Sequence, residues 1–337
     1  MDAFRQQAAK TFKEQIFTDR PMQYEVLKIV RQTSGRPALV TETLPVTVLQ
    51  TSDWIRADSV EPSLMLIHIE YDAAALQRFH TSEEDMLRLF HDLDLDPYML
   101  SMVYRDNMGY YQLPSRPAIW TTKEAVVAFF INVEPLKVLW SFNTSTCSVK
   151  GLILTRKTVG GRVSYRDFCQ LLNGHASLIA HPLLPCYCVV LDVMMFCDKI
   201  VAKQEEVISM TEAQTGYNPW SAVPDYASWS NSAEFEDLGS ISQKMSGTMV
   251  ELEDISRHMK IMARILASLA ETDYMTSIVH VNKEAFRVAH EDISQVLSLL
   301  RPQLEYTEVY IGYLRERARN QLTVVSDVRC AITVLTY

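Results

Sequence analysis

Glycine is scarce in this sequence, with 10 glycines among 337 residues. So low a content argues against glycine-rich phosphate-binding loops and against an all-β fold with many tight turns. The sequence contains no Gly-x-Ser-x-Gly elbow, Walker loop, His-Glu-x-x-His pair or Rossmann glycine pattern. We therefore expect no enzyme, no cofactor other than a metal ion and no small-molecule substrate.

Long apolar runs are also missing. The N-terminal stretch 1–17 is charged throughout and lacks the apolar centre of a signal peptide. The most apolar stretch, 181–197, is interrupted by Asp192 and is shorter than the roughly 20 residues that a membrane helix needs. The sequence as given is therefore expected to be soluble and cytoplasmic.

Positive charge is in deficit, because 32 Lys and Arg residues stand against 41 Asp and Glu residues, for a net charge of -9. A general nucleic-acid binder needs a basic surface, so nucleic acid is not an expected partner. Hydrophobic residues make up 48% of the chain, which is typical of a globular protein. The six cysteines lie mostly in apolar stretches and are predicted to be buried, reduced thiols.

The first part of the chain, 1–214, mixes strand and helix signals. Short runs rich in β-branched and aromatic residues predict strands, and the stretch 82–105 is predicted to begin as a helix with Ser82 as its N-cap. The predicted strands cover 24–30, 44–50, 64–71, 109–114, 124–133, 137–144 and 150–157. Strands, then a helix, then strands again predict an α/β domain of the α+β kind, a mixed sheet with flanking helices.

Two further helices are predicted to complete this domain, over 163–181 and from Pro185 to a C-cap at Gly216. Turn-forming residues then predict a linker over 215–240. Two alternatives stay open for it: a loop held by the aromatic anchors Trp220 and Trp229, or a disordered linker.

Long antiparallel helices are predicted over 241–328, followed by a short tail over 329–337. Apolar residues in the last helix step by three and four, which indicates a stalk-like, coiled-coil-like seam that faces another helix. Pro302 is compatible with this pattern if the helix restarts there. The predicted interface consists of Ile293, Leu297, Leu300, Leu304, Ile311, Leu314, Ala318 and Leu322.

Carboxylates stand at every second position in Asp92, Asp94 and Asp96, which resembles the opening of a calcium-binding EF-hand loop. Pro97 stands where that loop needs glycine, and Val103 where it needs a bidentate glutamate, so an EF-hand is excluded. Two interpretations remain: a looser divalent-cation site, for which Mg²⁺ is the expected ion, or a solvated turn after a helix.

Three arginines, Arg315, Arg317 and Arg319, flank the seam of the last helix. Alternate residues on a helix point about 200° apart, so the three side chains do not form one stripe. They are expected to be a solvated flank, to lie near anionic lipid headgroups, or to pair with acidic groups on a partner helix.

The stretch 313–325, "YLRERARNQLTVV", resembles the stalk helix of fungal CorA-like proteins, relatives of the CorA-type magnesium transporters. The stretches 145–157 and 181–220 resemble the last sheet strands and the following helix of that family. The resemblance implies the cytosolic domain of a divalent-cation transporter, a pentamer whose stalk helices line an axial route. It does not identify the residues that sense the metal.

The sequence departs from this family in one respect. Such transporters follow the stalk with two membrane helices and a Gly-Met-Asn signature, and neither occurs here. We therefore expect a chain that lacks the pore itself, and that lies at the cytosolic face of a membrane if a full-length form carries the spans. It would associate with itself or with a full-length membrane homologue. The alternative is a soluble helical scaffold that binds a protein partner through the 293–325 seam.

Overall fold

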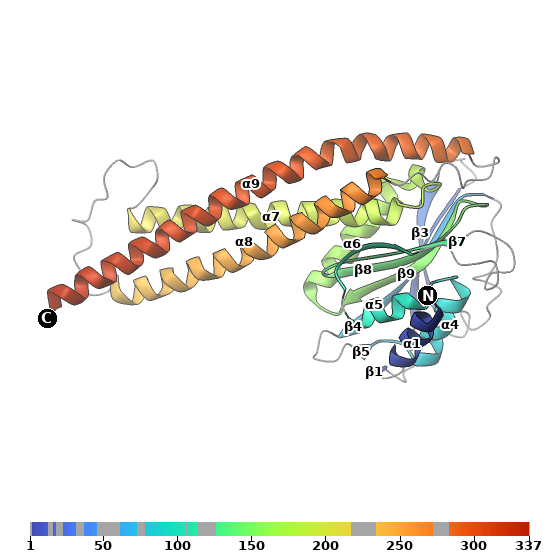
Figure 1. The fold of residues 1–337 in the computed structure, drawn as a ribbon, viewed down its shortest axis with the longest axis horizontal. Helices are drawn as coiled ribbons and strands as arrows, with labels where there is room; N and C mark the ends of the chain where they lie inside the picture. The colour runs from blue at the N-terminus through green and yellow to red at the C-terminus, as the bar shows by residue number, and fades with distance from the viewer. Residues whose placement is uncertain are drawn as a thin grey trace. The chain divides into compact units, whose positions relative to one another are not determined.

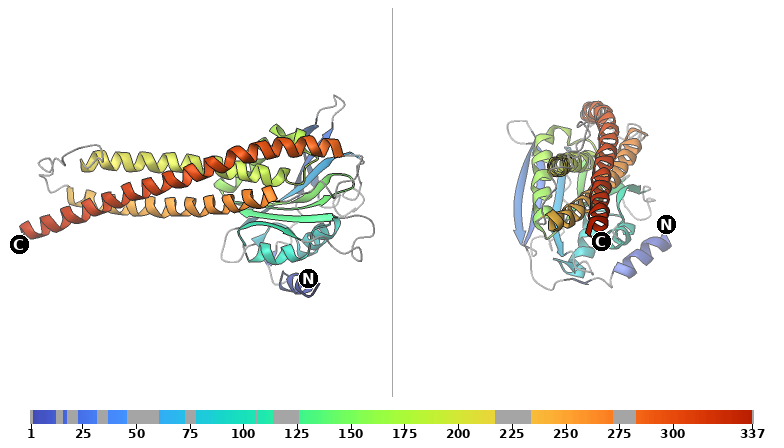
Figure 2. Two further views of the ribbon diagram at one scale, coloured as in Figure 1. Left: turned by 45° about the horizontal axis from the view of Figure 1, so that its top comes forward. Right: turned by 90° about the vertical axis from the view of Figure 1, so that its left-hand side faces the viewer.

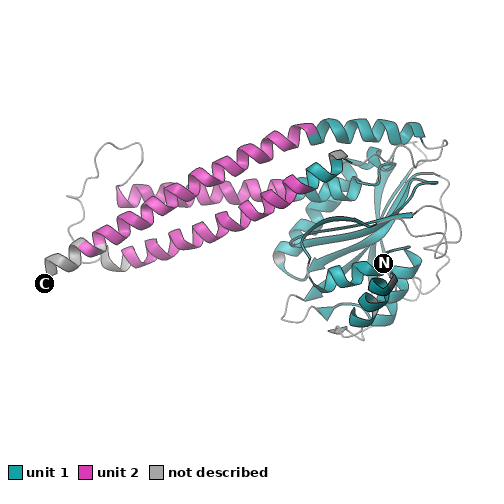
Figure 3. Ribbon diagram, viewed as in Figure 1, with its two compact units in different colours: residues 1–192, 265–297 teal, residues 193–264, 298–337 magenta. Residues whose placement is uncertain are grey.

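A computed structural model gives the fold of the chain (Figure 1). It describes residues 2–12, 16–17, 23–31, 37–45, 61–72, 78–105, 107–113, 126–216, 234–271 and 283–336. The chain divides into two compact units (Figure 3). Unit 1 comprises residues 1–192 and 265–297, and unit 2 comprises residues 193–264 and 298–337.

Unit 1 is built on a mixed sheet of nine strands. The strands are β1 (Ile16–Phe17), β2 (Gln23–Arg31), β3 (Pro37–Pro45), β4 (Ser63–Asp72), β5 (Arg78–Phe79), β6 (Gly109–Leu113), β7 (Val126–Val133), β8 (Leu136–Asn143) and β9 (Ser148–Arg156). The main order is β1-β5-β4-β9-β8-β7-β6, with β2 paired to β3 and β4. Because β4 and β9 are parallel while β6 to β9 form an antiparallel meander, the predicted mixed sheet with flanking helices is confirmed.

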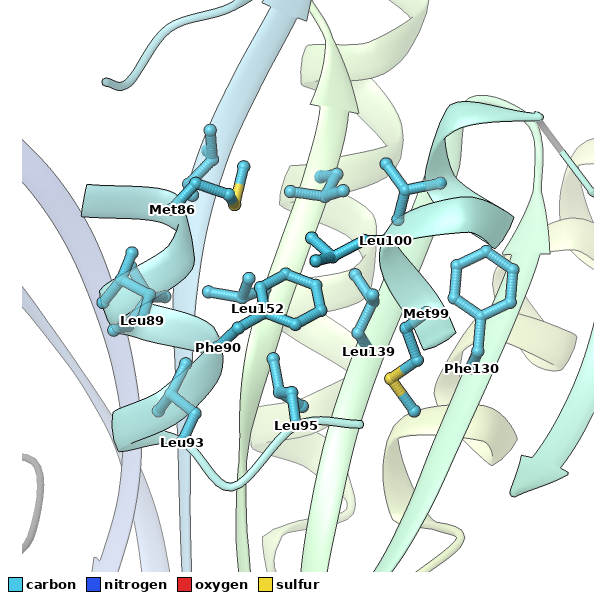
Figure 4. Packing of buried hydrophobic residues seen from close by; sticks show 14 of the residues in the cluster. Met86, Leu89, Phe90, Leu93, Leu95, Met99, Leu100, Phe130, Leu139 and Leu152 are labelled. Carbon is cyan, nitrogen blue, oxygen red and sulfur yellow. The ribbon is translucent and has the colours of Figure 1, made fainter. Parts of the chain in front are cut away.

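One face of this sheet is covered by α1 (Asp2–Phe12), α4 (Glu83–Asp92) and α5 (Tyr98–Tyr104). Apolar side chains of these helices pack onto every second residue of the strands, such as Leu139 and Leu152 (Figure 4). The predicted N-cap is confirmed, because the Ser82 hydroxyl accepts a hydrogen bond from the Asp85 N–H at 3.1 Å.

The opposite face of the sheet packs against α6 (Val159–Gly174), which is followed by a short 3-10 helix, η1 (Ala176–Leu178). Trp140 on β8 is fully buried there, stacks on Phe129 and donates a hydrogen bond to the Pro182 carbonyl at 2.7 Å. Gly151 lies opposite Trp140 on β9, and a Cβ at this position would lie 2.1 Å from the Leu139 carbonyl oxygen. Only glycine fits between these strands without a shift of the backbone.

Three long helices follow: α7 (Leu184–Thr215), α8 (Glu234–Glu271) and α9 (Lys283–Thr336). Each contributes residues to both units. Within unit 2 their segments lie side by side (Figures 2 and 3). The predicted end of α7 is confirmed, since Gly216 follows it with a φ of 67°, a conformation that favours glycine.

Several boundaries differ from the sequence prediction. α8 begins at Glu234, inside the linker predicted over 215–240, because Leu238 already follows the helical spacing of Ile241 and Met245. α9 continues through Pro302 and through most of the predicted tail 329–337. β3 ends at Pro45, and the rest of the strand predicted over 44–50 lies outside the described residues, as do Trp220 and Trp229.

In the part of the chain that the structure describes, no helix combines the length and the apolar character that a membrane crossing requires.

Candidate functional site

The three predicted metal ligands lie at the end of α4 and in the turn that leads to α5. Asp92 is the last residue of α4 and is buried beside His91, whose Nδ1 is 3.1 Å from its Oδ1. Asp94 is exposed and has a left-handed backbone with a φ of 55°. Asp96 is fully buried. The three carboxylates thus lie in different environments.

Asp96 binds an arginine of the N-terminal helix. Arg5 on α1 donates to its carboxylate from Nε at 3.0 Å and from Nη2 at 2.6 Å. The same carboxylate accepts a hydrogen bond from the Tyr98 N–H at 2.9 Å, at the start of α5. These contacts attach α1 to the α4–α5 turn. Because they occupy the Asp96 carboxylate, the Asp92, Asp94 and Asp96 set does not fit a metal site in this conformation. Throughout the described ranges, no group of three or more His, Cys, Asp and Glu side chains could hold a metal ion.

The predicted interface seam of α9 is buried within the single chain. Ile293, Leu300, Leu304, Ile311, Leu314 and Ala318 are each no more than 7% exposed. Leu297 and Leu322 are partly exposed at its margin. The periodicity correctly identified the buried face of the helix, but the partners are helices of the same chain. The prediction that this seam binds another molecule is therefore corrected: it is core.

The three predicted arginines have three different acidic partners. Arg315 pairs with Glu253 on α8 at 2.6 Å, Arg317 pairs with Glu212 on α7 at 2.6 Å, and Arg319 pairs with Glu316 one turn earlier on α9. This arrangement follows from the 200° angle between alternate helical residues. Arg315 and Arg317 thus connect α9 to both neighbouring helices of unit 2.

The Arg317 site has the most complete geometry of the three. Its guanidinium donates to the Glu212 carboxylate from Nε at 2.9 Å and from Nη2 at 2.6 Å, and to the Ser209 hydroxyl at 3.1 Å. It also lies over the Tyr313 ring, 5.5 Å from the ring centroid. Both charged side chains are largely buried, and the hydrogen bond to Glu212 raises the pKa of the Arg317 guanidinium.

Two histidines meet in unit 1. The Leu183 N–H donates to Nδ1 of His181 at 3.2 Å, so neutral His181 carries its proton on Nε2. That nitrogen lies 3.2 Å from Nδ1 of His290 on α9, to which it can donate. Burial, reinforced by His290, lowers the pKa of His181 to about 3. His181 is therefore neutral at physiological pH, and its ring contact with His290 joins α9 to the turn before α7.

A second buried histidine, His68 on β4, lies under α6. Its ring stacks on Tyr165 at 3.8 Å between centroids, and its Nε2 is 2.7 Å from the Thr155 hydroxyl. Burial lowers the pKa of His68 to about 4, and burial raises the pKa of the nearby Cys169 thiol to about 12. Neither group is poised to act as a base or a nucleophile at neutral pH.

A shallow hollow of about 560 Å³ lies along α8, between Val250 and Arg264. Its two carboxylates are already engaged, Glu253 with Arg315 and Asp254 with Arg257. The remaining charged side chains that line the hollow, Arg257, Lys260 and Arg264, are all basic.

Arg5, Glu212 and Tyr313 were missed as partners in the sequence. The signal for the latter two was present, because Glu205 and Glu212 on α7 and Tyr306 and Tyr313 on α9 repeat at seven residues. A seven-residue repeat keeps side chains on one helix face. No comparable signal indicates Arg5.

The stretches that resemble CorA-like proteins fall on regular elements: 145–157 contains β9, 313–325 lies within α9, and 181–220 contains α7. A scan against protein-family models and a search of curated proteins both found no match for this chain. The family assignment therefore stays a prediction.

Proposed function

We propose that this chain forms the cytosolic, regulatory part of a CorA-like divalent-cation transport protein, with Mg²⁺ as the ion. The observation that supports it is the order of the elements. A mixed α/β sheet comes first, two long helices follow, and a single helix of 54 residues comes last. At a rise of about 1.5 Å per residue, α9 is about 80 Å long, the kind of element that connects a regulatory domain to a distant site.

In this proposal α9 transmits conformational changes of the regulatory part. Its ion pairs with Glu212 on α7 and Glu253 on α8 connect it to both neighbours, so a rearrangement of either helix acts on it. The two pairs are chemically specific contacts, and a bound cation that competed for either carboxylate would weaken them. The proposal does not use the Asp92, Asp94 and Asp96 turn, because Arg5 neutralises Asp96.

Self-association in this proposal uses a surface other than the buried seam. Leu299, Tyr306 and Val309 on α9 are each more than 70% exposed, and this row is the apolar surface that the helix offers to another molecule. The scaffold alternative, in which a protein partner binds through the 293–325 seam, is not favoured because six of the eight predicted seam side chains are buried.

Size-exclusion chromatography with light scattering tests the proposal. The metal-free chain is compared in chelator, in millimolar MgCl₂, and in KCl of matched ionic strength. We expect the molar mass or the elution volume to change with Mg²⁺ and not with KCl. A monomer with the same elution volume under all three conditions would contradict the proposal.

A further inference from the structure

The hollow along α8 lies on a face of this helix that the described residues leave largely exposed. Its lining side chains are spaced by three and four positions, which places them on one side of the helix. They are Val250, Glu253, Asp254, Arg257, Lys260, Ile261 and Arg264. The buried seam of α8 follows the same spacing on the opposite side, through Leu252, Ile255, Met259 and Met262. α8 thus has two faces with helix-packing periodicity, and the described part of the chain fills one of them.

The shape of the hollow fits a second helix. From Val250 to Arg264 the helix rises about 21 Å, or about four turns. The hollow follows this length, is shallow and has a volume of about 560 Å³. Small-molecule sites enclose most of their ligand, whereas packed helices insert a ridge of side chains into a long, open groove. The hollow therefore has the form of a groove for a helix.

The charges of the hollow are balanced at one end and unbalanced at the other. Its two carboxylates lie towards the start of the hollow, and arginines engage both of them. At the other end Lys260 and Arg264 are exposed and stand one turn apart. Neither makes an ion pair or a hydrogen bond with the residues that the structure describes. The half-buried Ile261 lies between them, so two unpaired cations flank an apolar side chain.

Two kinds of anionic partner fit this end less well than a protein does. Nucleic acid needs a broad basic surface, whereas this hollow contains two carboxylates in a chain with a net charge of -9. An anionic membrane surface attracts clusters of about four to eight Lys and Arg residues, and it is not matched by a concave groove with two unpaired cations. Carboxylates one turn apart on a helix have the spacing of Lys260 and Arg264.

We infer that the hollow on α8 is the docking site for an acidic amphipathic helix of a protein partner. Two carboxylates one turn apart on that helix would pair with Lys260 and Arg264, and an apolar side chain between them would pack on Ile261. Because the two cations are exposed, the ion pairs would set the orientation and the association rate of the partner. This site involves neither Mg²⁺ nor the exposed row on α9, so it is independent of the proposed function.

Fluorescence anisotropy at low ionic strength tests the inference with two labelled helical peptides of identical composition. In the first peptide, leucines and pairs of glutamates one turn apart share one face of the helix. In the second, the same residues are shuffled around the helix, so that net charge is kept and the face is lost. We expect the first peptide to bind the full chain at least about tenfold more tightly than the second, and NaCl to weaken its binding.

Charge reversal in the hollow separates specific docking from general attraction. Lys260→Glu with Arg264→Glu should weaken binding of the first peptide at least about tenfold. Lys199→Glu with Lys203→Glu is the matched control, because these exposed lysines on α7 have the same spacing but do not line the hollow. It should bind like the parent chain. A peptide with lysine in place of glutamate should bind the first variant and not the parent chain, which also shows that the variant is folded.

Four results would overturn the inference. The first is equal affinity of the parent chain for the ordered and the shuffled peptide, and the second is an equal loss of binding in the α7 control variant. The third is tighter binding of the chain to phosphatidylserine vesicles than to the peptide, which would assign the hollow to a membrane surface. The fourth is self-association of the parent chain that Lys260→Glu with Arg264→Glu abolishes in light scattering, which would assign the hollow to a second copy.

Discussion

Arg5 and Asp96 are separated by 91 residues and form a bidentate ion pair inside unit 1. The pair attaches the N-terminal helix α1 to the turn between α4 and α5, which contains two of the three predicted metal ligands, Asp94 and Asp96. Asp96 is completely buried, so its charge needs the guanidinium of Arg5 in order to remain in the interior.

Asp96→Asn should therefore destabilise the chain. Removing one partner of a buried ion pair typically costs about 3–5 kcal/mol, because the other charge is left in the interior without compensation. Urea unfolding followed by circular dichroism measures this change in the free energy of unfolding.

Glu84→Ala is the control, since its pair with Arg88 is exposed and should contribute less than about 1 kcal/mol. Equal stability of Asp96→Asn and the parent chain would show that the Arg5 contact does not hold this turn.

Leu314→Ala tests whether the α9 seam is core. Leu314 is fully buried, so its truncation should lower the free energy of unfolding by about 2–5 kcal/mol at every protein concentration. Val250→Ala, on the exposed face of α8, should change it by less than about 0.5 kcal/mol. A loss that appears only at low protein concentration would instead mean that the seam is an interface between molecules.

The sequence predicted local features of this fold well and long-range pairings poorly. Ser82 as an N-cap and Gly216 as a helix end depend on their immediate neighbours, and both are confirmed. The seam around Leu314 was recognised because periodicity shows which face of a helix is buried, yet it cannot show what buries it. The Arg5–Asp96 pair depends on how α1 docks onto α5, which no local pattern encodes.

Acid should destabilise the chain through His68. Its pKa is about 4 in the folded chain, below the value near 6.5 expected when unfolded. Below pH 6.5 the unfolded chain therefore binds more protons, and stability falls by up to about 1.4 kcal/mol per pH unit until pH 4.

His68→Gln should make the decline in unfolding free energy between pH 6.5 and 4 less steep, as urea titrations at each pH would measure. Identical slopes in His68→Gln and the parent chain would contradict the assignment of this titration to His68.

Thiol reactivity should separate Cys330 from the other five cysteines. Cys330 is exposed, whereas Cys147, Cys186, Cys188 and Cys197 are buried and Cys169 is half-buried. Burial raises the pKa of Cys147 to about 11 and of Cys197 to about 12, which suppresses their thiolates at neutral pH. Titration with a disulfide reagent at pH 7.5 should show one fast thiol, with the remainder reacting only in denaturant. Cys330→Ser should remove the fast phase, and its persistence would refute this ranking.

Isothermal titration calorimetry of MgCl₂ into the metal-free chain tests the proposed regulatory role in divalent-cation transport most directly. The titration is repeated with KCl of equal ionic strength, so that screening of the chain's net charge is separated from specific binding. The account predicts saturable binding of Mg²⁺ at millimolar concentration that persists in Asp94→Asn, because the proposal does not use the α4–α5 turn. Heats for Mg²⁺ that are no different from those for KCl would contradict it.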